Sequence, residues 1–511
     1  MRLRDAVRIK EGWSRPQTNR ADGHVKRLSK DRDDQLFDKE VKDLVCEWAI
    51  NRDQVRKFWK YLKKQRFTQS KFEVKKFREA LTRFTEPNHK YGGWRKAHEL
   101  AKFLLEDEFK RANLKMLHYR ETDDIAAALP RKDTHAGIEY VEYGKRKKGE
   151  YLDELFNMYT RAEKEARLQR SFNAIILPGT RTQASGAFDD FGNETPDRIK
   201  YKSRLVSIVG LRQILAECKF ARPVQQFMSG VKWYAGGKSD AEICGYMTGL
   251  RSDLKYWVCI DYSSFDQTIS DWLIRDAFDI MRAAFGQDSF FDDDLFSIVR
   301  EDFIHKIFLD VDGTLLESHK GVPSGSMFTQ IVDSIVNRLM IQAYFISKNI
   351  PLNTVVMCIM GDDNIIFSAS KLDEEELASY LAYNYGVEVN PDKFEKGTWD
   401  DHPTFLSREW TPDGANRDPW VLVMKLFYPE RFRDYYQWHE GIPPTRPDEV
   451  VYSYILSFPV GMRRLIHVDK FVDHFLREHG VLRSDARHGA GSNYIRALEA
   501  RIKSSFWGKS A

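Results

Sequence analysis

Two adjacent carboxylates interrupt an apolar run in VVMCIMGDDNIIF, residues 355–367. Six apolar side chains lead to Gly361, Asp362 and Asp363 follow, and three more apolar side chains come soon after. This pattern predicts two buried strands joined by a hairpin turn. Two carboxylates between such strands repel each other unless a cation neutralises them, so they are candidate metal ligands. Taken by itself, the tripeptide is also compatible with a plain hairpin turn.

A third carboxylate stands about one hundred residues earlier, in KYWVCIDYSSFDQTISDWLI. Residues 256–260 predict a buried strand that ends at Asp261, and the segment around Trp272 to Met281 predicts a helix. Asp261 at a strand end can meet Asp362 and Asp363 at a neighbouring turn, forming an oxygen-ligand site for hard divalent cations. Two such ions can activate a hydroxyl and stabilise a leaving pyrophosphate.

Between these segments lies GVPSGSMFTQIVDSIVNRLM, residues 321–340, which predicts a loop followed by a helix from Ser326. Apolar residues three or four positions apart form a predicted core face: Phe328, Ile331, Ile335 and Leu339. A second face carries a hydroxyl, a carboxylate and an amide one turn apart, at Thr329, Asp333 and Asn337. That polar face can read the sugar of a nucleotide, although it is also compatible with a helix face in water.

The composition favours a large globular protein. The chain has 511 residues, 42% of them apolar, so several subdomains are expected. No apolar run is long enough to span a membrane, and the charged N-terminus does not resemble a secretory signal. The five cysteines are scattered without paired spacing, which favours reduced thiols over a zinc site. The net charge is +4, but residues 51–80 are basic and rich in aromatics. That segment predicts either a polyanion-binding groove or an ordinary amphipathic helix.

The three chemistry-bearing segments together resemble a viral RNA-dependent RNA polymerase of the right-hand palm type. Asp261 and Asp266 match the D-x4-D of its motif A, PSG…T…D…N matches motif B, and MGDDNI matches motif C. Their order and spacing fit as well. The text of motifs A and B, FDQTISDWLI and SGSMFTQIVDSIVN, is most similar to double-stranded RNA viruses of the picobirnavirus type, with partitiviruses second.

Further segments resemble the remaining motifs of that family. Residues 132–148 are similar to motif G at the template channel, which implies template contacts by Thr134, His135, Ala136 and Gly137. Residues 198–210 resemble motif F, which implies triphosphate binding by Arg198, Lys200, Lys202 and Arg204. Residues 387–410 resemble motif D, with Lys393 as a general acid, and motif E, with Phe405, Leu406 and Arg408 at the growing 3′ end. Lys393 is equally compatible with a solvated turn lysine.

The resemblance also implies a ligand set around the nucleotide. Mg²⁺ is expected at Asp261, Asp362 and Asp363, and Mn²⁺ can substitute. The ribose is expected to lie among Asp266, Ser324, Gly325, Thr329, Asp333 and Asn337. Many positive-strand virus polymerases have asparagine where this chain has Asp333. A carboxyl group there donates a hydrogen bond only when protonated. The hydrogen bonds between the protein and the ribose hydroxyls are therefore expected to differ from those of the positive-strand virus polymerases.

The implied architecture is an α/β (α+β) fold of fingers, palm and thumb, helix-rich, with a small antiparallel palm sheet. We expect an arm at 1–45, fingers at 46–250 whose N-terminal helical region bridges to the thumb, and a palm at 251–410. An inserted fingers segment is expected around 291–320, with the thumb and C-terminal tail at 411–511. Residues 1–45 are charged and lack apolar periodicity, which predicts an arm lying across the surface.

The implied activity is RNA-templated joining of NTPs, for viral genome replication and transcription. The expected partners are RNA template, nascent RNA, NTPs and a viral capsid protein, without a membrane, in the virion interior or host cytoplasm. Two alternatives stay open. A reverse transcriptase shares the palm, but Met360, Gly361 and Asp266 favour ribonucleotides. A non-catalytic RNA-packaging protein explains the basic segments but not the spaced aspartates.

Overall fold

The structure, a computed structural model, describes residues 25–27, 32–64, 68–70, 74–93, 95–129, 132, 134–143, 147–182, 184–185, 203–250, 253–310, 312–411, 414–427, 436, 443–482, 495–500 and 502. These residues fall into two compact units. The first contains the described residues of Glu73–Thr180 and Leu205–Leu406, and the second those of Asp22–Phe72, Arg181–Arg204 and Ser407–Ala511. No helix in these ranges is both long and apolar enough to cross a membrane.

The first unit is rich in helices. In chain order these are α4 (Val74–Arg83), α5 (Lys96–Lys110), α6 (Thr122–Ala128), α7 (Leu155–Gln169), α8 (Leu211–Gly230), α9 (Asp240–Thr248), α10 (Phe265–Thr268), α11 (Asp271–Ala283), α12 (Asp293–Ile304), α13 (Thr329–Ser347) and α14 (Glu374–Tyr385). The helix expected around Trp272 to Met281 is confirmed as α11.

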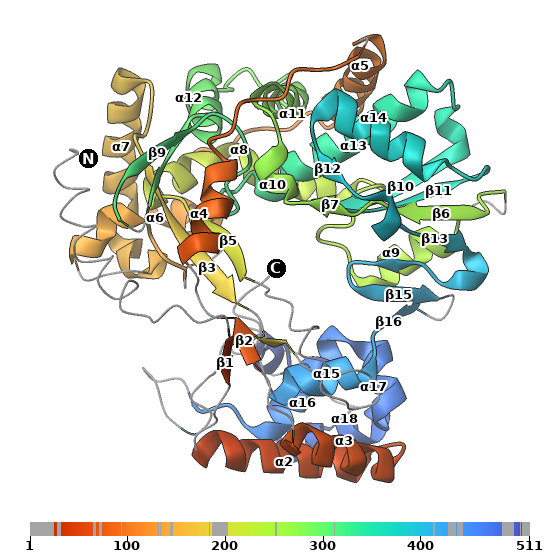
Figure 1. Cartoon of the computed structure of the whole chain (residues 1–511). Helices are drawn as coiled ribbons and strands as arrows, with labels where there is room; N and C mark the ends of the chain where they lie inside the picture. Colours follow the sequence, from red (N-terminus) through yellow and green to blue (C-terminus); the bar gives the residue numbers. More distant parts are fainter. Residues whose placement is uncertain are drawn as a thin grey trace. The chain divides into compact units, whose positions relative to one another are not determined.

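The central sheet of this unit has the strand order β10–β11–β6–β13, and all its pairs are antiparallel. Its strands are β6 (Tyr256–Cys259), β10 (Val355–Met360), β11 (Asp363–Ser368) and β13 (Glu395–Thr398). Helices α13 and α14 lie over one face of it (Figure 1). A short antiparallel pair of β7 (Tyr262–Ser263) and β12 (Glu388–Val389) continues beside it. The expected α/β class with a small antiparallel sheet is therefore confirmed.

A second sheet in this unit has the order β5–β3–β8–β9. Its strands are β3 (Ile175–Thr182), β5 (Ser203–Ile208), β8 (Lys306–Leu309) and β9 (Leu315–Ser318). The β8–β9 hairpin is antiparallel, whereas β3 and β8 run parallel. Parallel neighbours need a long connection, and here it includes the whole stretch from β5 to α12. This sheet therefore unites distant parts of the chain.

The apolar stripe predicted for the helix after the PSG loop is the buried face of α13. Phe328, Ile331, Ile335 and Leu339 are all fully buried. The ring of Phe328 packs on Phe278 of α11, with centroids 4.9 Å apart. Burying four such side chains contributes roughly 1.5–3 kcal/mol each. Helix α13 is therefore fixed by its core face, which leaves its polar residues in defined positions.

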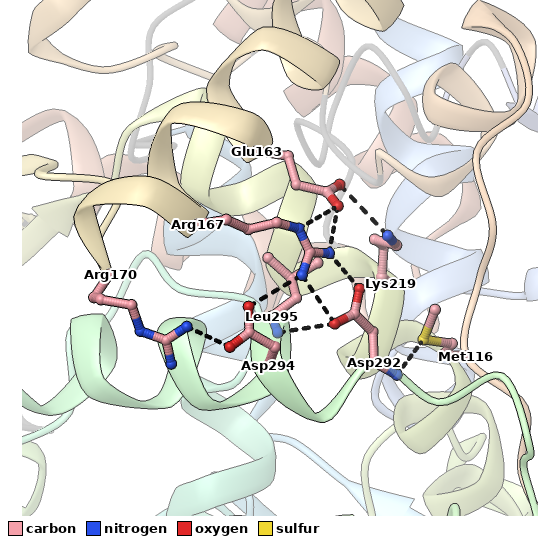
Figure 2. A network of polar contacts seen from close by, with 8 residues as sticks. All are labelled: Met116, Glu163, Arg167, Arg170, Lys219, Asp292, Asp294 and Leu295. Carbon is pink, nitrogen blue, oxygen red and sulfur yellow. Dashed lines mark hydrogen bonds and ion pairs between the residues drawn. The ribbon is translucent and has the colours of Figure 1, made fainter.

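Three helices of the first unit meet at an ion-pair network, drawn in Figure 2. The Arg167 guanidinium of α7 donates to Glu163 on its own helix at 2.6 Å and to Asp292 and Asp294 at the start of α12. Lys219 of α8 lies 3.5 Å from the same Glu163 carboxylate. Asp292 also caps α12 by accepting from the Leu295 N–H at 3.0 Å. The network therefore ties α7, α8 and α12 together.

The second unit joins an N-terminal segment to the C-terminal one. Its helices are α2 (Arg32–Trp48), α3 (Arg52–Lys64), α15 (Pro419–Phe427), α16 (Pro447–Ser457), α17 (Pro459–Leu465) and α18 (Val468–Glu478). Its strands are β1 (Val25–Arg27), β2 (Thr68–Ser70), β4 (Ala184–Ser185), β15 (Arg408–Thr411) and β16 (Gly414–Asn416). Strand β2 pairs with both β1 and β4, and β15 pairs with β16. A single apolar core includes residues of α2, α3 and α15 to α18.

The expectation of an arm without apolar periodicity at 1–45 is wrong for residues 32–45. They belong to α2, whose Phe37, Val41 and Val45 recur every four residues and are buried in the core of the second unit. The boundary expected at residue 45 falls inside this helix. This apolar face is narrow and was not recognised in the sequence, because charged residues occupy most of the other positions of α2.

The basic, aromatic segment 51–80 contributes to two cores where it is described. Phe58 and Trp59 of α3 pack against the core of the second unit, and the Trp59 ring lies 4.7 Å from that of Phe427. Phe77 of α4 is 4% exposed. The amphipathic-helix interpretation therefore holds for these three rings. The side chains of Tyr61, Phe67 and Phe72 lie outside the described residues.

Candidate active site

The Gly-Asp-Asp tripeptide forms the turn of the β10–β11 hairpin, as predicted. The hairpin register pairs Met360 with Asp363, so Gly361 and Asp362 make the turn itself. Strand β11 also pairs with β6, matching Ile366 with Val258. Continued by three residues, that register brings Asp363 opposite Asp261. The structure therefore brings together the three aspartates that the sequence separates by about one hundred residues.

A buried amide holds the two aspartate segments in register. Asn364 is 2% exposed, and its Oδ1 accepts the Ile260 N–H at 3.1 Å. Its Nδ2 donates to the Ile260 carbonyl at 3.3 Å and to the Asp362 carbonyl at 3.1 Å. Ile260 immediately precedes Asp261. One side chain therefore fixes the backbone on which both Asp261 and Asp362 stand.

A second amide, Asn337 of α13, supports the turn from behind. Its Nδ2 donates to the Gly361 carbonyl at 2.9 Å and to the Asp362 carbonyl at 3.2 Å. Its Oδ1 accepts the Tyr262 hydroxyl at 3.0 Å. One turn earlier, the Ser334 hydroxyl accepts the Gly361 N–H at 2.8 Å. Asn337 is fully buried with both polar atoms used, so in this structure it positions the turn, and its predicted ribose contact stays a prediction.

The three aspartates differ from these supports in exposure. Asp261, Asp362 and Asp363 are all solvent-exposed, and among the described residues no Lys or Arg forms an ion pair with Asp261 or Asp362. Exposed carboxylates gathered at one sheet edge are the hard oxygen donors that Mg²⁺ and Mn²⁺ prefer. The donor set thus fits a divalent ion, although within the described ranges no three ligands already close around one point.

Asp333 and Asp266 add carboxyl groups behind the turn. Asp333 is 4% exposed, and its Oδ1 has no hydrogen-bond partner in the described structure. Burial, together with the nearby charges of Asp266 and Asp362, raises the pKa of Asp333 well above its usual value. These effects favour the protonated form of Asp333. In that form it can donate a hydrogen bond, which the sequence alone left open.

The PSG loop before α13 is docked on strand β5. The Ser324 Oγ accepts the Ser207 N–H at 2.9 Å. At the next residue, a Cβ on Gly325 would lie 1.9 Å from the Ser207 carbonyl oxygen, so only glycine permits this approach. The Thr329 hydroxyl donates back to the Pro323 and Ser326 carbonyls at 2.7 and 3.0 Å. The loop is thus a closed turn beside β5, the strand that contains Arg204 of motif F.

A buried carboxylate holds the far end of this loop. Glu217 of α8 is fully buried, and its Oε2 accepts the Ser326 hydroxyl and the Met327 N–H, both at 2.8 Å. Gln213 donates to its Oε1 at 2.9 Å. Burial raises the pKa of Glu217 to about 7. Among the described residues it forms no ion pair. Hydrogen bonds therefore hold this carboxyl group.

The motif F residues are only partly described. Arg198, Lys200 and Lys202 lie outside the described residues, and Arg204 is described only as a backbone position in β5. Their predicted contacts with the triphosphate stay predictions. The position of Arg204, three residues before Ser207 in the same strand, is the one relation to the PSG loop that the structure gives.

The THAG segment is fixed by its backbone. The Thr134 carbonyl accepts the Lys148 N–H at 2.8 Å, and the Ala136 carbonyl accepts the Leu211 N–H at 2.7 Å. His135 Nδ1 accepts the Gly137 N–H at 3.0 Å. Ala136 and Gly137 are buried, and Gly137 adopts a positive φ of 117°. His135 is thus a turn residue in this structure, and its predicted template contact is untested.

The motif D and E residues occupy short elements. Lys393 is exposed at the end of a 3₁₀ turn (η5, Pro391–Lys393), a position compatible with both predicted roles. Phe405 is buried in β14 (Thr404–Phe405), whose Thr404 carbonyl accepts the Cys259 thiol at 3.2 Å. Leu406 is half-buried with a positive φ of 54°. In the second unit, Arg408 of β15 lies over the Phe458 ring, 6.0 Å from its centroid.

Sequence reasoning missed the residues that position the site. Asn364 stood in the quoted MGDDNI segment, and an amide inside an apolar strand is a signal that it bonds to backbone. Tyr262 and Ser334 gave no comparable signal. Glu217 lies in a helix that is apolar on several sides, where a lone carboxylate indicates a specific partner. These residues act through the backbone of the motifs.

Comparisons with known proteins agree with this geometry. Residues 56–425, well over half of the chain, match the family model described as viral RNA-dependent RNA polymerase. The RNA-directed RNA polymerase of Cryptosporidium parvum virus 1 (strain KSU-1) is 29% identical over 292 residues, which is 54% of this chain and 51% of that protein.

Two genome polyproteins are similar over shorter shares of their length. That of Human rhinovirus 3 is 30% identical over 163 residues, 30% of this chain and 7% of the polyprotein. That of Poliovirus type 2 (strain W-2) is 27% identical over 300 residues, 55% of this chain and 12% of the polyprotein. The matched region thus spans about half of the Cryptosporidium virus protein and a small part of each polyprotein.

Proposed function

Because the chain belongs to the viral RNA-dependent RNA polymerase family, we propose that it joins NTPs into RNA on an RNA template. The observation that carries the proposal is the convergence of Asp261 with the Asp362–Asp363 turn, held by the Asn364 amide. Asp261 and Asp362 are exposed and form no ion pair with a Lys or Arg among the described residues, which suits a reaction in which metal and phosphate arrive together.

The proposed metal ligands are Asp261 and Asp362, with Asp363 as the outer partner. The family uses divalent metals, and we propose Mg²⁺, with Mn²⁺ as a substitute. When bound, the ions lower the pKa of the attacking 3′-hydroxyl and neutralise the leaving pyrophosphate. The protein's own contribution is to hold the carboxylates at one sheet edge, which the Asn364 and Asn337 amides do through the Asp362 carbonyl.

Ribonucleotide selection is proposed for the residues next to the turn. Asp266, Ser324 and Asp333 are candidates to contact the ribose, and the raised pKa of Asp333 favours the protonated form, which can donate a hydrogen bond. The 2′-hydroxyl both donates and accepts hydrogen bonds, so such polar groups can distinguish ribose from deoxyribose. Lys393 is proposed as general acid for the pyrophosphate, and Arg204 with Lys202 as triphosphate ligands.

We further propose that the chain serves genome replication and transcription in a double-stranded RNA virus of the picobirnavirus or partitivirus type, with a capsid protein as partner. The text of motifs A and B supports this assignment. The proposed location is the virion interior or host cytoplasm. A primer-free reaction on single-stranded RNA tests the replication step. Products resistant to single-strand nuclease are expected, and only nuclease-sensitive products would contradict it.

The test of the activity is incorporation of labelled NTPs by the purified protein on a short RNA template with Mg²⁺. We expect template-dependent product with wild type and with Asp400→Ala, an exposed aspartate in η6 (Trp399–Asp401), and none with Asp362→Ala. Equal synthesis by Asp362→Ala would contradict the metal assignment. Synthesis of DNA from dNTPs in preference to RNA from NTPs would support the reverse transcriptase alternative. RNA binding without any nucleotide incorporation would support a packaging protein.

A further inference from the structure

A lysine ammonium is buried next to the PSG loop without a carboxylate partner in the described structure. Lys306, the first residue of β8, is 3% exposed. Its three N–H groups are shared among four backbone carbonyls within hydrogen-bond distance of Nζ, those of Phe303 at 3.0 Å, Ile304 at 3.1 Å, Lys320 at 2.8 Å and Gly321 at 2.8 Å. Burial lowers the pKa of Lys306 to about 7. A buried cation is costly, so a hydrophobic residue would be expected unless these contacts serve a purpose.

The four carbonyls belong to two different segments. Phe303 and Ile304 end α12, where the helix dipole and unpaired carbonyls favour a cation. Lys320 and Gly321 begin the PSG loop, five and four residues before Gly325. The Ser318 hydroxyl adds a second donor to the Lys320 carbonyl at 2.9 Å. Lys306 therefore fastens the start of the loop to the end of a rigid helix.

The same loop segment is bonded directly to motif A. The Gly321 N–H donates to the Ile269 carbonyl at 2.7 Å, and the Val322 N–H donates to the Asp266 carbonyl at 2.6 Å. Gly321 has a φ of 74°, and a Cβ there would lie 2.9 Å from the Asp266 carbonyl oxygen. Asp266 and Ser324 are the two proposed ribose residues that flank this contact. Their separation is thus set by backbone hydrogen bonds that Lys306 supports.

We propose that Lys306 is a positioning residue for sugar selection, which fixes the distance between Asp266 and Ser324 by holding the Lys320 and Gly321 carbonyls. The inference rests on the proposed polymerase function. Lys306 touches neither nucleotide nor metal in this scheme. It acts at the start of the loop, whereas the Glu217 carboxylate holds the far end through Ser326 and Met327.

The chain offers a matched control for this role. Lys102 of α5 is also largely buried, with a side chain 17% exposed, and its Nζ donates to Asp276 at 2.7 Å and Asp279 at 2.8 Å on α11. It ties two helices together without contacting the PSG loop or motif A through any hydrogen bond in the described structure. Replacing either lysine by methionine keeps most of the length of the side chain and removes its charge and its hydrogen-bond donors.

The experiment compares Lys306→Met with Lys102→Met in single-nucleotide incorporation, using an NTP and the matching dNTP. Relaxed spacing between Asp266 and Ser324 weakens contacts to the 2′-hydroxyl. We therefore expect Lys306→Met to lower the ratio of kcat/KM for NTP over dNTP about tenfold, the value of one ordinary hydrogen bond. Lys102→Met is expected to lower the melting temperature while leaving that ratio within about twofold of wild type.

A purely structural lysine would give a different result. Both variants would then lose stability and slow both nucleotides equally, and an unchanged ratio in folded Lys306→Met would overturn the proposal. If Lys306→Met does not fold, Gly321→Ala tests the same contact with Lys306 intact, because its Cβ pushes against the Asp266 carbonyl and the Phe84 ring. A ratio unchanged in that variant overturns the proposal as well.

Failure of the underlying function gives a distinct outcome. Wild-type protein that incorporates no NTP on any RNA template contradicts the polymerase assignment, whatever the variants do. Wild-type protein that polymerises normally, with variants of unchanged sugar preference, contradicts only the role of Lys306.

Discussion

The network around Arg167 and the turn at Asp362 use the same residue type in opposite ways. In the network, carboxylates of α7 and α12 are held by the Arg167 guanidinium, and Asp294 also by Arg170 (Figure 2). At the turn, Asp261 and Asp362 have no Lys or Arg partner among the described residues. The difference separates carboxylates that join helices from carboxylates ready for an external cation.

The pKa directions follow the same division. Although burial acts to raise it, the hydrogen bond from Arg167 lowers the pKa of Asp292. Burial raises the pKa of Asp333, and there Asp266 and Asp362 add to the effect. A carboxylate beside an arginine is stabilised as an anion, whereas a carboxyl group beside other carboxylates keeps its proton until a cation arrives.

The largest expected effect is at the turn. Asp362→Asn keeps the shape of the side chain and the backbone carbonyl bonds but removes a charge. RNA synthesis is expected to fall by at least about 10³-fold, since a metal contributes several kcal/mol to the transition state. The melting temperature should stay the same or rise, because a repulsive charge is lost. A radiolabelled primer-extension assay measures RNA synthesis, and a thermal melt measures the melting temperature. Near-normal RNA synthesis by Asp362→Asn would contradict the assignment of Asp362 as a metal ligand, in contrast to the carboxylates that pair with Arg167.

Glu217 is an intermediate case, a buried carboxyl group held by hydrogen bonds that forms no ion pair among the described residues. Its pKa is about 7 when folded and near 4.5 when unfolded, so the folded state binds its proton more tightly. Its contribution to stability is therefore fully present below about pH 4.5 and is lost as pH rises to about 7, by up to about 3 kcal/mol.

Glu217→Gln is expected to abolish that loss. Urea unfolding at pH 5 and pH 8 should show a smaller decrease in unfolding free energy for the variant than for wild type. The other buried carboxyl groups, including Asp302 with a pKa of about 6, contribute equally to both proteins and cancel. Identical pH dependence in the two proteins would show that Glu217 is not protonated when folded.

The network should respond in stability and not in activity. Arg167→Met leaves the Asp292, Asp294 and Glu163 carboxylates close together without their shared cation. Since the Arg167 side chain is 32% exposed, solvent screens part of the loss, and we expect about 2 kcal/mol of destabilisation. Activity per folded molecule should stay within about twofold of wild type at 20 °C. A loss of activity without a loss of stability in Arg167→Met would contradict the conclusion that the network only joins helices.

The smallest expected effect is the stabilisation of the protein by Mg²⁺. Mg²⁺ at millimolar concentration should raise the melting temperature of wild type by a few degrees at most, through about 1 kcal/mol of binding free energy. The shift should vanish in Asp362→Asn and persist in Arg167→Met. Differential scanning fluorimetry with and without EDTA measures it. Equal shifts in all three proteins would indicate ion binding elsewhere.

The sequence predicted the parts of the site that depend on local pattern. The apolar runs around Asp362, the strand before Asp261 and the core stripe of α13 are all as expected, because burial imposes a period of two on strands and 3.6 on helices. The antiparallel pairing of β6 with β11 then places Asp261 beside the turn, as the strand-end position of Asp261 predicted. Convergence of the aspartates was therefore accessible from pattern alone.

The hydrogen bonds that fix the site were not accessible in that way. The bond from the Asn337 amide to the turn was not predicted, because helix periodicity gives the face of a residue but not its hydrogen-bond partner. Lys306 and Glu217 bind segments that are distant in the sequence. A charged residue in an apolar stretch indicates that it has a partner, but the sequence does not identify which carbonyl or hydroxyl that partner is. Helix α2 was missed because its stripe is narrow among charged residues.

The Asn337 amide has a mechanical consequence. It is anchored in a helix whose core face is fully buried, and it grips two successive carbonyls of the catalytic turn. An axial shift of α13 would therefore move the backbone of Gly361 and Asp362 with it. If Asp333 of the same helix contacts the ribose as proposed, a misplaced sugar would therefore also displace the turn that carries the proposed metal ligand Asp362.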